Sequence, residues 1–171
     1  YLENGLIENN DCIGFRGYMM GPSTIINGLT IRNSGDSSSN DVPLQSGFYL
    51  RSANWAPTID NLEVSGSIGA GIHLMKSSLR GSDWNVNNNS GVGLYIQESH
   101  PEIEGLETMD NGLNGVQVYD SSNVLLVNAS AARNGANATG ISDGVGYLYQ
   151  ESNTITASTK DVTCRTCSSL D

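Results

Sequence analysis

The stretch Gly93-Leu94-Tyr95-Ile96, followed by Ser99, decides the fold. It reads as glycine, apolar, any residue, apolar, two variable residues and a small residue. The same phrase occurs five times, and its copies begin 24, 22, 22 and 31 residues apart. The copies run from Gly47 to Ala53, Gly71 to Ser77, Gly93 to Ser99, Gly115 to Ser121 and Gly146 to Ser152. A period near 22 residues with strand-like content predicts that each copy is one coil of a solenoid.

Apolar residues alternate with other residues inside each copy, which is the period of a strand with one face in the core. We expect Phe48, Leu50, Ile72, Leu74, Leu94, Ile96, Val116 and Val118 to point inward. A second strand then follows with the spacing apolar-x-x-apolar-x-apolar. Its copies are Ile26, Leu29 and Ile31; Ile59, Leu62 and Val64; Ile103 and Leu106; Val124, Val127 and Ala129; and, more loosely, Leu79, Trp84 and Val86.

A turn rich in asparagine and glycine follows the second strand. Both residue types tolerate positive φ, so the chain can turn sharply there at low cost. An asparagine at one place in every coil can also bond through its amide to the coils above and below. We therefore interpret these asparagines as structural. The turns are Asn33-Ser34-Gly35, Asn89-Ser90-Gly91, Asn111-Gly112 and Asn134-Gly135.

Strands that recur every 22 residues without intervening helices exclude a doubly wound sheet, whose crossovers need helical segments. An antiparallel sandwich is an alternative, but phrases in register favour like strands stacked on like. The pattern Gly-apolar-x-apolar, Ser, apolar-x-x-apolar-x-apolar, Asn-x-Gly resembles the right-handed parallel β-helix repeat of the pectate-lyase-like superfamily, from about Cys12 to about Ile155. We therefore predict an all-β, right-handed parallel β-helix of about six coils with about 22 residues each.

The coils are expected to occupy residues 1-155, and residues 156-171 are expected to form a C-terminal tail with a Cys-x-x-Cys at Cys164 and Cys167. Neither end shows a cap, and Asn4-Gly5 looks like the turn of an earlier coil. An uncapped solenoid end exposes a sheet edge and an open core. Two explanations are open: the segment belongs to a longer β-helix, or its ends stack head to tail into a filament.

The formal net charge of −10 argues against nucleic acid and anionic membrane surfaces as partners. We therefore expect no nucleic-acid binding and no membrane insertion. The three cysteines favour a local disulfide, or pairing with residues outside the segment, over a zinc site, which needs four ligands. Glycosylation sequons begin at Asn88, Asn128 and Asn137, a number that chance explains in a chain rich in Asn, Ser and Thr.

The outward positions of the first strand are the candidate binding face. Two residues after each glycine they hold Tyr49, His73, Tyr95, Gln117 and Leu148, and four residues after it Arg51, Met75, Gln97, Tyr119 and Gln150. Aromatic rings beside amide and guanidinium groups suit a carbohydrate. The alternative is an ordinary exposed strand face. The candidate carbohydrate-binding residues are Tyr49, Arg51, His73, Tyr95, Gln97, Gln117 and Tyr119. Two insertions, 36–45 and 135–143, flank this face at one corner.

The next position in each coil holds Ser52, Lys76, Glu98, Asp120 and Glu151. Three neighbouring carboxylates repel one another unless a cation or Lys76 lies between them. Calcium accepts such ligands, which makes Glu98, Asp120 and Glu151 candidate calcium ligands. The alternative is a solvated turn. No other cofactor is expected.

Catalytic motifs of the resembled superfamily are mostly missing. The Asn-Thr-Asp, Asp-Asp and Gly-His-Gly of its polygalacturonases do not occur, and Arg51 and Arg80 lie in no lyase motif. Ser99-His100-Pro101-Glu102 is similar to the Asp-Pro-His-Glu of alginate epimerases, but the order differs and the leading Asp is absent. One alternative is that Glu98 and Asp120 form the pair of carboxyl groups that a glycosidase uses. Catalytic residues are therefore not assigned, and the pattern leans against an enzyme.

We interpret the chain as part of an extracellular or cell-surface β-helix. We expect it to act as a non-catalytic scaffold or adhesive module that binds a polysaccharide or surface glycan on the Tyr49–Tyr119 face. The first alternative is a polysaccharide lyase, epimerase or hydrolase of the superfamily, with a site partly outside this segment. The second is a filament subunit that self-associates end to end.

Overall fold

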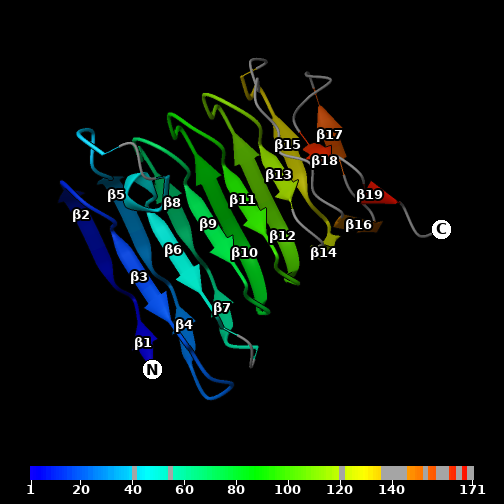
Figure 1. Cartoon of the computed structure of the whole chain (residues 1–171), viewed down its shortest axis with the longest axis horizontal. Helices are drawn as coiled ribbons and strands as arrows, with labels where there is room; N and C mark the ends of the chain where they lie inside the picture. The colour runs from blue at the N-terminus through cyan, green and yellow to red at the C-terminus, as the bar shows by residue number, and fades with distance from the viewer. Residues whose placement is uncertain are drawn as a thin grey trace.

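Two parallel β-sheets run along the whole stack in the computed structural model, the six-stranded one lying over the thirteen-stranded one in Figure 1. The structure describes residues 1–39, 42–53, 56–119, 122–135, 146–151, 154–156, 162–164 and 167–168. Side chains are described as far as residue 135, except those of Val42, Tyr119, Asn123 and Ala132. As far as residue 132 the chain passes through both sheets once per turn, and about five turns are formed, close to the six expected.

The six-stranded sheet holds the first strand of each coil. Its members are β3 (Phe15–Tyr18), β6 (Phe48–Arg51), β9 (Ile72–Met75), β11 (Leu94–Gln97), β13 (Val116–Tyr119) and β18 (Val162–Cys164). Every pairing is parallel, and Leu94 lies opposite both Ile72 and Val116. Four copies of the glycine phrase therefore stack in register, which confirms the predicted parallel solenoid.

The thirteen-stranded sheet holds the second and third strands of each coil. Its members are β1 (Leu2–Glu3), β2 (Leu6–Asn10), β4 (Ile25–Asn27), β5 (Thr30–Ser34), β7 (Thr58–Asp60), β8 (Glu63–Ser65), β10 (Arg80–Asn87), β12 (Glu102–Met109), β14 (Asn123–Val127), β15 (Ser130–Ala132), β16 (Gly146–Glu151), β17 (Thr154–Thr156) and β19 (Cys167–Ser168). In the coils from β1 to β15 the bend between the two halves has positive φ, at Asn4, Gly28, Asn61, Asp83, Gly105 and Asn128. Asparagine, aspartate and glycine are the residues that adopt this conformation most readily.

The last copy of the glycine phrase does not follow the others. Strand β16, which begins at Gly146, pairs with β14 in the thirteen-stranded sheet, and β18 takes the place beside β13. The prediction that Leu148 and Gln150 extend the binding face is therefore wrong. Strands β18 and β19 also place part of the expected tail, residues 156–171, inside the stack.

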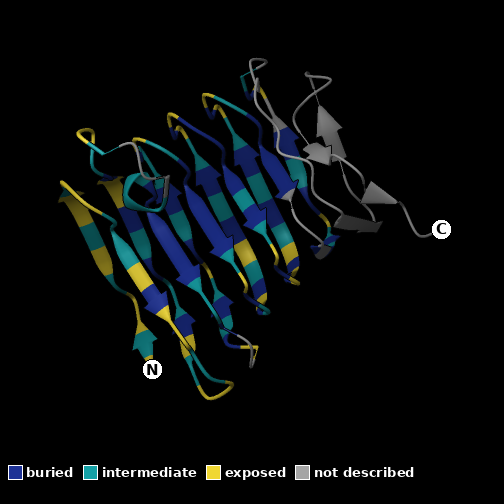
Figure 2. Ribbon diagram, in the orientation of Figure 1, coloured by how far each residue is buried: buried dark blue, intermediate teal, exposed yellow. Residues whose placement is uncertain are grey.

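The core lies between the two sheets and consists almost entirely of aliphatic side chains. Figure 2 colours the ribbon of the buried residues dark blue. Phe15 and Phe48 stack at 4.9 Å between ring centroids. In the coil of β14 the register puts Leu126 opposite Ile103, so the apolar series there is Leu126, Ala129 and Ala131. The predicted series that includes Val127 is wrong, because Val127 is only partly buried.

Trp84 replaces a missing side chain in the core. Gly81 occupies the register position that holds Ile59 and Ile103 in the neighbouring coils. A Cβ on Gly81 would lie 2.6 Å from the indole carbons of Trp84, so the indole fills that space. The indole nitrogen also donates to the carbonyl of Ile59 at 2.8 Å.

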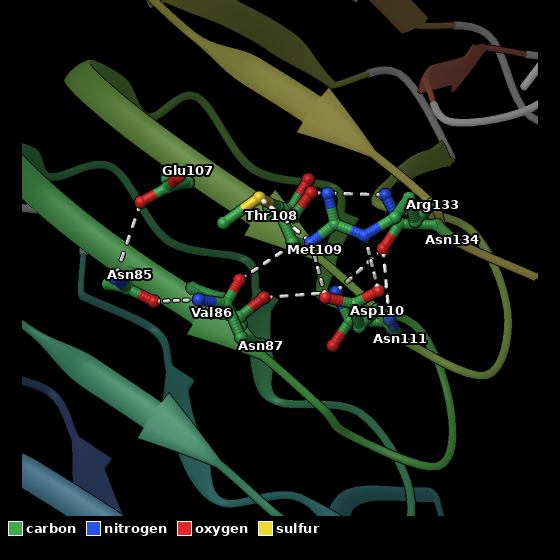
Figure 3. A network of polar contacts seen from close by, with 10 residues as sticks. All are labelled: Asn85, Val86, Asn87, Glu107, Thr108, Met109, Asp110, Asn111, Arg133 and Asn134. Carbon is green, nitrogen blue, oxygen red and sulfur yellow. Dashed lines mark hydrogen bonds and ion pairs between the residues drawn. The ribbon is translucent and has the colours of Figure 1, made fainter. Parts of the chain in front are cut away.

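A ladder of buried asparagines joins the later coils, as the sequence predicts. The Oδ1 atom of Asn111 accepts from the backbone and side-chain nitrogens of Asn89 at 3.1 and 3.0 Å. Its Nδ2 donates to the carbonyl of Val86 and to Oδ1 of Asn134 at 2.9 Å each (Figure 3). All three asparagines are at most 6 % exposed. The earlier coils carry Ser34 and Ser67 at this position. Asn33, which we expected in the ladder, is exposed one position earlier and bonds Asn9.

A second ladder, made of small residues, links neighbouring coils at the corner that follows the strands of the six-stranded sheet. The backbone nitrogens of Ala53, Ser77 and Ser99 each donate to the serine hydroxyl of the following coil at 3.0–3.3 Å. The last acceptor is Ser122, whereas the sequence phrase predicts Ser121. The coil that contains β13 is therefore one residue longer at this corner.

The first predicted insertion, 36–45, contains a short 3₁₀ helix, η1 (Val42–Gln45). It folds back on itself, because the backbone nitrogen of Asp36 donates to the carbonyl of Leu44 at 3.0 Å. The second insertion, 135–143, lies outside the described residues from 136 onward. Within the part of the chain that the structure describes, no helix is long and apolar enough to cross a bilayer.

Replacing Gly81 with alanine should destabilise the protein by about 2 kcal/mol, because the new methyl group overpacks the space that Trp84 fills. Gly21→Ala is the matched control, since no atom lies within 4 Å of a Cβ at that position. Urea denaturation measures both free energies of unfolding. Equal stability of the two variants would contradict the assigned packing.

Candidate functional site

Three aromatic side chains form a row on the outer face of the six-stranded sheet. Tyr49, His73 and Tyr95 occupy the same register position in β6, β9 and β11, and Gln117 continues the column in β13. The rings of Tyr49 and His73 lie 5.1 Å apart, and those of His73 and Tyr95 lie 4.7 Å apart in an edge-to-face arrangement. The sequence places these residues together correctly.

The row is more buried than we expect from the sequence. Tyr49 and His73 are each 3 % exposed and Gln117 is 5 % exposed, whereas Tyr95 is half-buried. Strands about 4.8 Å apart bring equivalent side chains into contact with those above and below, so interior members of a column cover one another. The prediction of an exposed row of rings is therefore wrong for Tyr49 and His73.

The adjacent column holds Arg51, Met75 and Gln97, all half-buried. The hydroxyl of Tyr49 donates to the sulfur of Met75 at 3.4 Å, which links the two columns. The Nε atom of Arg51 is buried and has no hydrogen-bond partner. Tyr119 continues this column by register, and its side chain lies outside the described set.

Strand β3 adds residues to this face that the sequence analysis missed. Arg16 pairs by register with Tyr49, and its guanidinium carbon lies 5.9 Å from the centre of that ring. Tyr18 lies beside Arg51 and is 55 % exposed. The glycine phrase is hard to recognise in β3, because Gly17 stands at the second apolar position and Met20 fills the space beside it. The Gly14-Phe15 pair was the available signal.

His73 has an unusual environment for a titratable group. Neither ring nitrogen has a hydrogen-bond partner. Burial disfavours the charged imidazolium and lowers the pKa of His73 to about 4. The imidazole is therefore neutral at neutral pH.

Of the predicted calcium ligands, the described part of the corner that follows these strands holds Glu98. Glu98 forms an ion pair with Lys76 at 3.4 Å, and both residues have positive φ. Glu151 pairs by register with Val127 in the other sheet, so its predicted place in the column of Glu98 is wrong. Asp120 lies outside the described residues. Within the described part, no three His, Cys, Asp or Glu side chains lie close enough to hold a metal ion.

Two of the three sequons begin at exposed corners. Asn88 and Asn128 are exposed and have positive φ, and Asn137 lies outside the described residues. Cys12 is exposed and free. Strands β18 and β19 place Cys164 and Cys167 in different sheets.

Acidification should destabilise the protein through His73. The unfolded imidazole binds a proton as the pH falls through 6.5, whereas the folded one stays neutral until about 4. Between pH 6.5 and about 4 the unfolded state therefore binds more protons than the folded state, so the free energy of unfolding decreases as the pH is lowered. We expect His73→Phe to remove about 3 kcal/mol of this loss, at 1.36 kcal/mol per pH unit.

Denaturation from pH 7 to pH 4 measures this difference, and His100→Phe is the control because His100 is exposed. Parallel pH profiles for wild type and His73→Phe would contradict the burial of a neutral imidazole.

Comparison with known proteins agrees with this geometry. The family described as right handed beta helix region matches residues 3–163 of the chain. No curated protein and no solved structure matches the chain significantly.

Proposed function

The chain belongs to the right-handed β-helix family, and on that premise we propose that it is a non-catalytic, extracellular or cell-surface module that binds glycans. The binding surface is the outer face of the six-stranded sheet at strands β3, β6, β9 and β11. The observation that carries the proposal is the row of Tyr49, His73 and Tyr95, flanked by Tyr18 and Arg16.

The accessible part of this face has the chemistry that sugars require. Tyr18 offers an exposed ring, on which the CH face of a pyranose can stack. Arg16 and Arg51 offer hydrogen-bond donors to hydroxyl groups beside it. The buried rings of Tyr49 and His73 support these groups from below. The rigid sheet keeps the side chains in fixed positions, which lowers the entropic cost of binding.

The titratable groups on the face favour binding over catalysis. Glycoside hydrolysis uses two carboxyl groups across the scissile bond. On the described part of this face the acidic residue is Glu98, which is ion-paired to Lys76. His73 is buried, so a substrate cannot reach its nitrogens without rearrangement.

Tyr18→Ala should abolish or strongly weaken retention of the protein on a glycan array, because the variant removes the exposed stacking ring. Tyr1→Ala is the matched control, since Tyr1 is a 79 % exposed tyrosine outside the six-stranded sheet. The same glycans are then incubated with wild-type protein and analysed for cleavage.

Absence of any array signal for wild type would refute glycan binding. Turnover of a retained glycan would refute the non-catalytic part and favour the lyase, epimerase or hydrolase alternative.

A second function, self-association through the N-terminal coil, is favoured by a separate observation. Of the six exposed large hydrophobic side chains in the described residues, five lie within residues 1–25: Tyr1, Leu6, Tyr18, Met19 and Ile25. In the part of the chain that the structure describes, strands β1, β2 and β3 each pair with one neighbour. A strand edge beside exposed apolar side chains favours pairing with a further strand, either from another copy of the chain or from a longer β-helix to which this segment belongs.

Sedimentation velocity at rising concentration tests this second function. We expect wild type to form larger species and Leu6→Lys, on the free edge of β2, to shift the equilibrium toward monomer. Ile68→Lys is the control, because Ile68 is exposed but lies away from this end. A monomer at every concentration would refute self-association.

A further inference from the structure

Two arginines in the described residues lack a carboxylate partner, and both lie on the proposed glycan face. The chain has eight Lys and Arg residues, and six remain when Lys160 and Arg165, outside the described part, are set aside. Four of the six form ion pairs at 2.6–3.4 Å: Arg32 with Glu63, Lys76 with Glu98, Arg80 with Glu102 and Arg133 with Asp110. The two that remain are Arg16 and Arg51.

These two arginines flank one aromatic ring. The register of β3 and β6 pairs Arg16 with Tyr49 and Tyr18 with Arg51, so the arginines are diagonal neighbours with Cα atoms about 8 Å apart. The guanidinium of Arg16 lies against the ring of Tyr49. Both positive charges therefore border the same patch of the sheet.

Unsatisfied hydrogen-bonding groups surround the same ring. The Nε atom of Arg51 is buried without a partner, and so are both nitrogens of His73, whose side chain is 97 % covered and next to Tyr49. A buried polar atom without a partner costs free energy. The nitrogens of His73 lie out of a ligand's reach, so the groups that can meet acceptor oxygens at this patch are the guanidinium groups of Arg16 and Arg51.

Because the whole chain is negatively charged, this patch is a distinctive place on its surface for an anion to bind. With a formal net charge of −10, most of the protein repels anions. Two guanidinium groups without a carboxylate partner give this face a local positive charge. Guanidinium groups bind planar or tetrahedral oxyanions through paired hydrogen bonds. We infer that this patch binds a negatively charged substituent of the glycan, a carboxylate or a sulfate ester, between Arg16 and Arg51. The inference rests on the proposed function of the face.

An array that carries each glycan backbone in neutral, carboxylated and sulfated forms tests the inference. Wild type should prefer the anionic forms at least tenfold. Arg16→Gln and Arg51→Gln should each weaken binding of the anionic forms about tenfold more than they weaken binding of the neutral forms. Arg80→Gln is the matched control, because it removes the same charge from an exposed arginine on the other sheet. Circular dichroism verifies that each variant is folded, and Arg16 is exposed enough to be replaced safely.

The outcomes separate this inference from the function on which it rests. A preference for carboxylated or for sulfated forms, lost in the two variants but kept in Arg80→Gln, supports the inference and identifies the anion. Equal retention of neutral and anionic forms overturns it and leaves glycan binding intact. An equal loss in Arg80→Gln overturns the assigned patch. No retention of any form refutes the proposed function itself.

Discussion

In the later coils the buried side-chain amide of one asparagine per coil binds the neighbouring coils, and the register of the stack depends on that contact. Asn111 satisfies the nitrogens of Asn89 and itself bonds Asn134 and a core carbonyl. Each bond spans 22 to 25 residues. A shift of one coil by one residue would leave these buried groups unpaired and turn every core side chain outward. The ladder therefore ties the coils to a single register.

Strand register also builds the proposed binding face. Because like positions lie above one another, Arg16, Tyr49 and His73 come from strands far apart in sequence yet form one column. The same stacking buries the rings and leaves the nitrogens of His73 without partners. A β-helix thus converts a short repeat into a rigid linear array of side chains, and differences between coils, such as the two unpaired arginines, determine what it can recognise.

Much of the fold could be predicted from the repeat, because the glycine phrase reflects the local requirements of one strand and the asparagine reflects those of one turn. The sheet position of Gly47, Gly71, Gly93 and Gly115 and the ladder of Asn89, Asn111 and Asn134 follow from such requirements. The strand that begins at Gly146 was predicted in the wrong sheet, because an alternation of apolar and other residues is compatible with a strand of either sheet. Strand β3 was missed because Met20 supplies the bulk that Gly17 lacks. The burial of Tyr49 depends on side chains in neighbouring coils, which no single phrase reveals.

The central claim, that the amide ladder holds the coils in register, is tested most directly by the free energy of unfolding of Asn111→Ala. Alanine leaves the nitrogens of Asn89 and the carbonyl of Val86 buried without these bonds, and we predict a loss of about 3 kcal/mol. Asn85→Ala, which removes a half-buried amide from the outer face of the same stack, should cost less than about 1 kcal/mol. Equal small losses in the two variants would contradict the account.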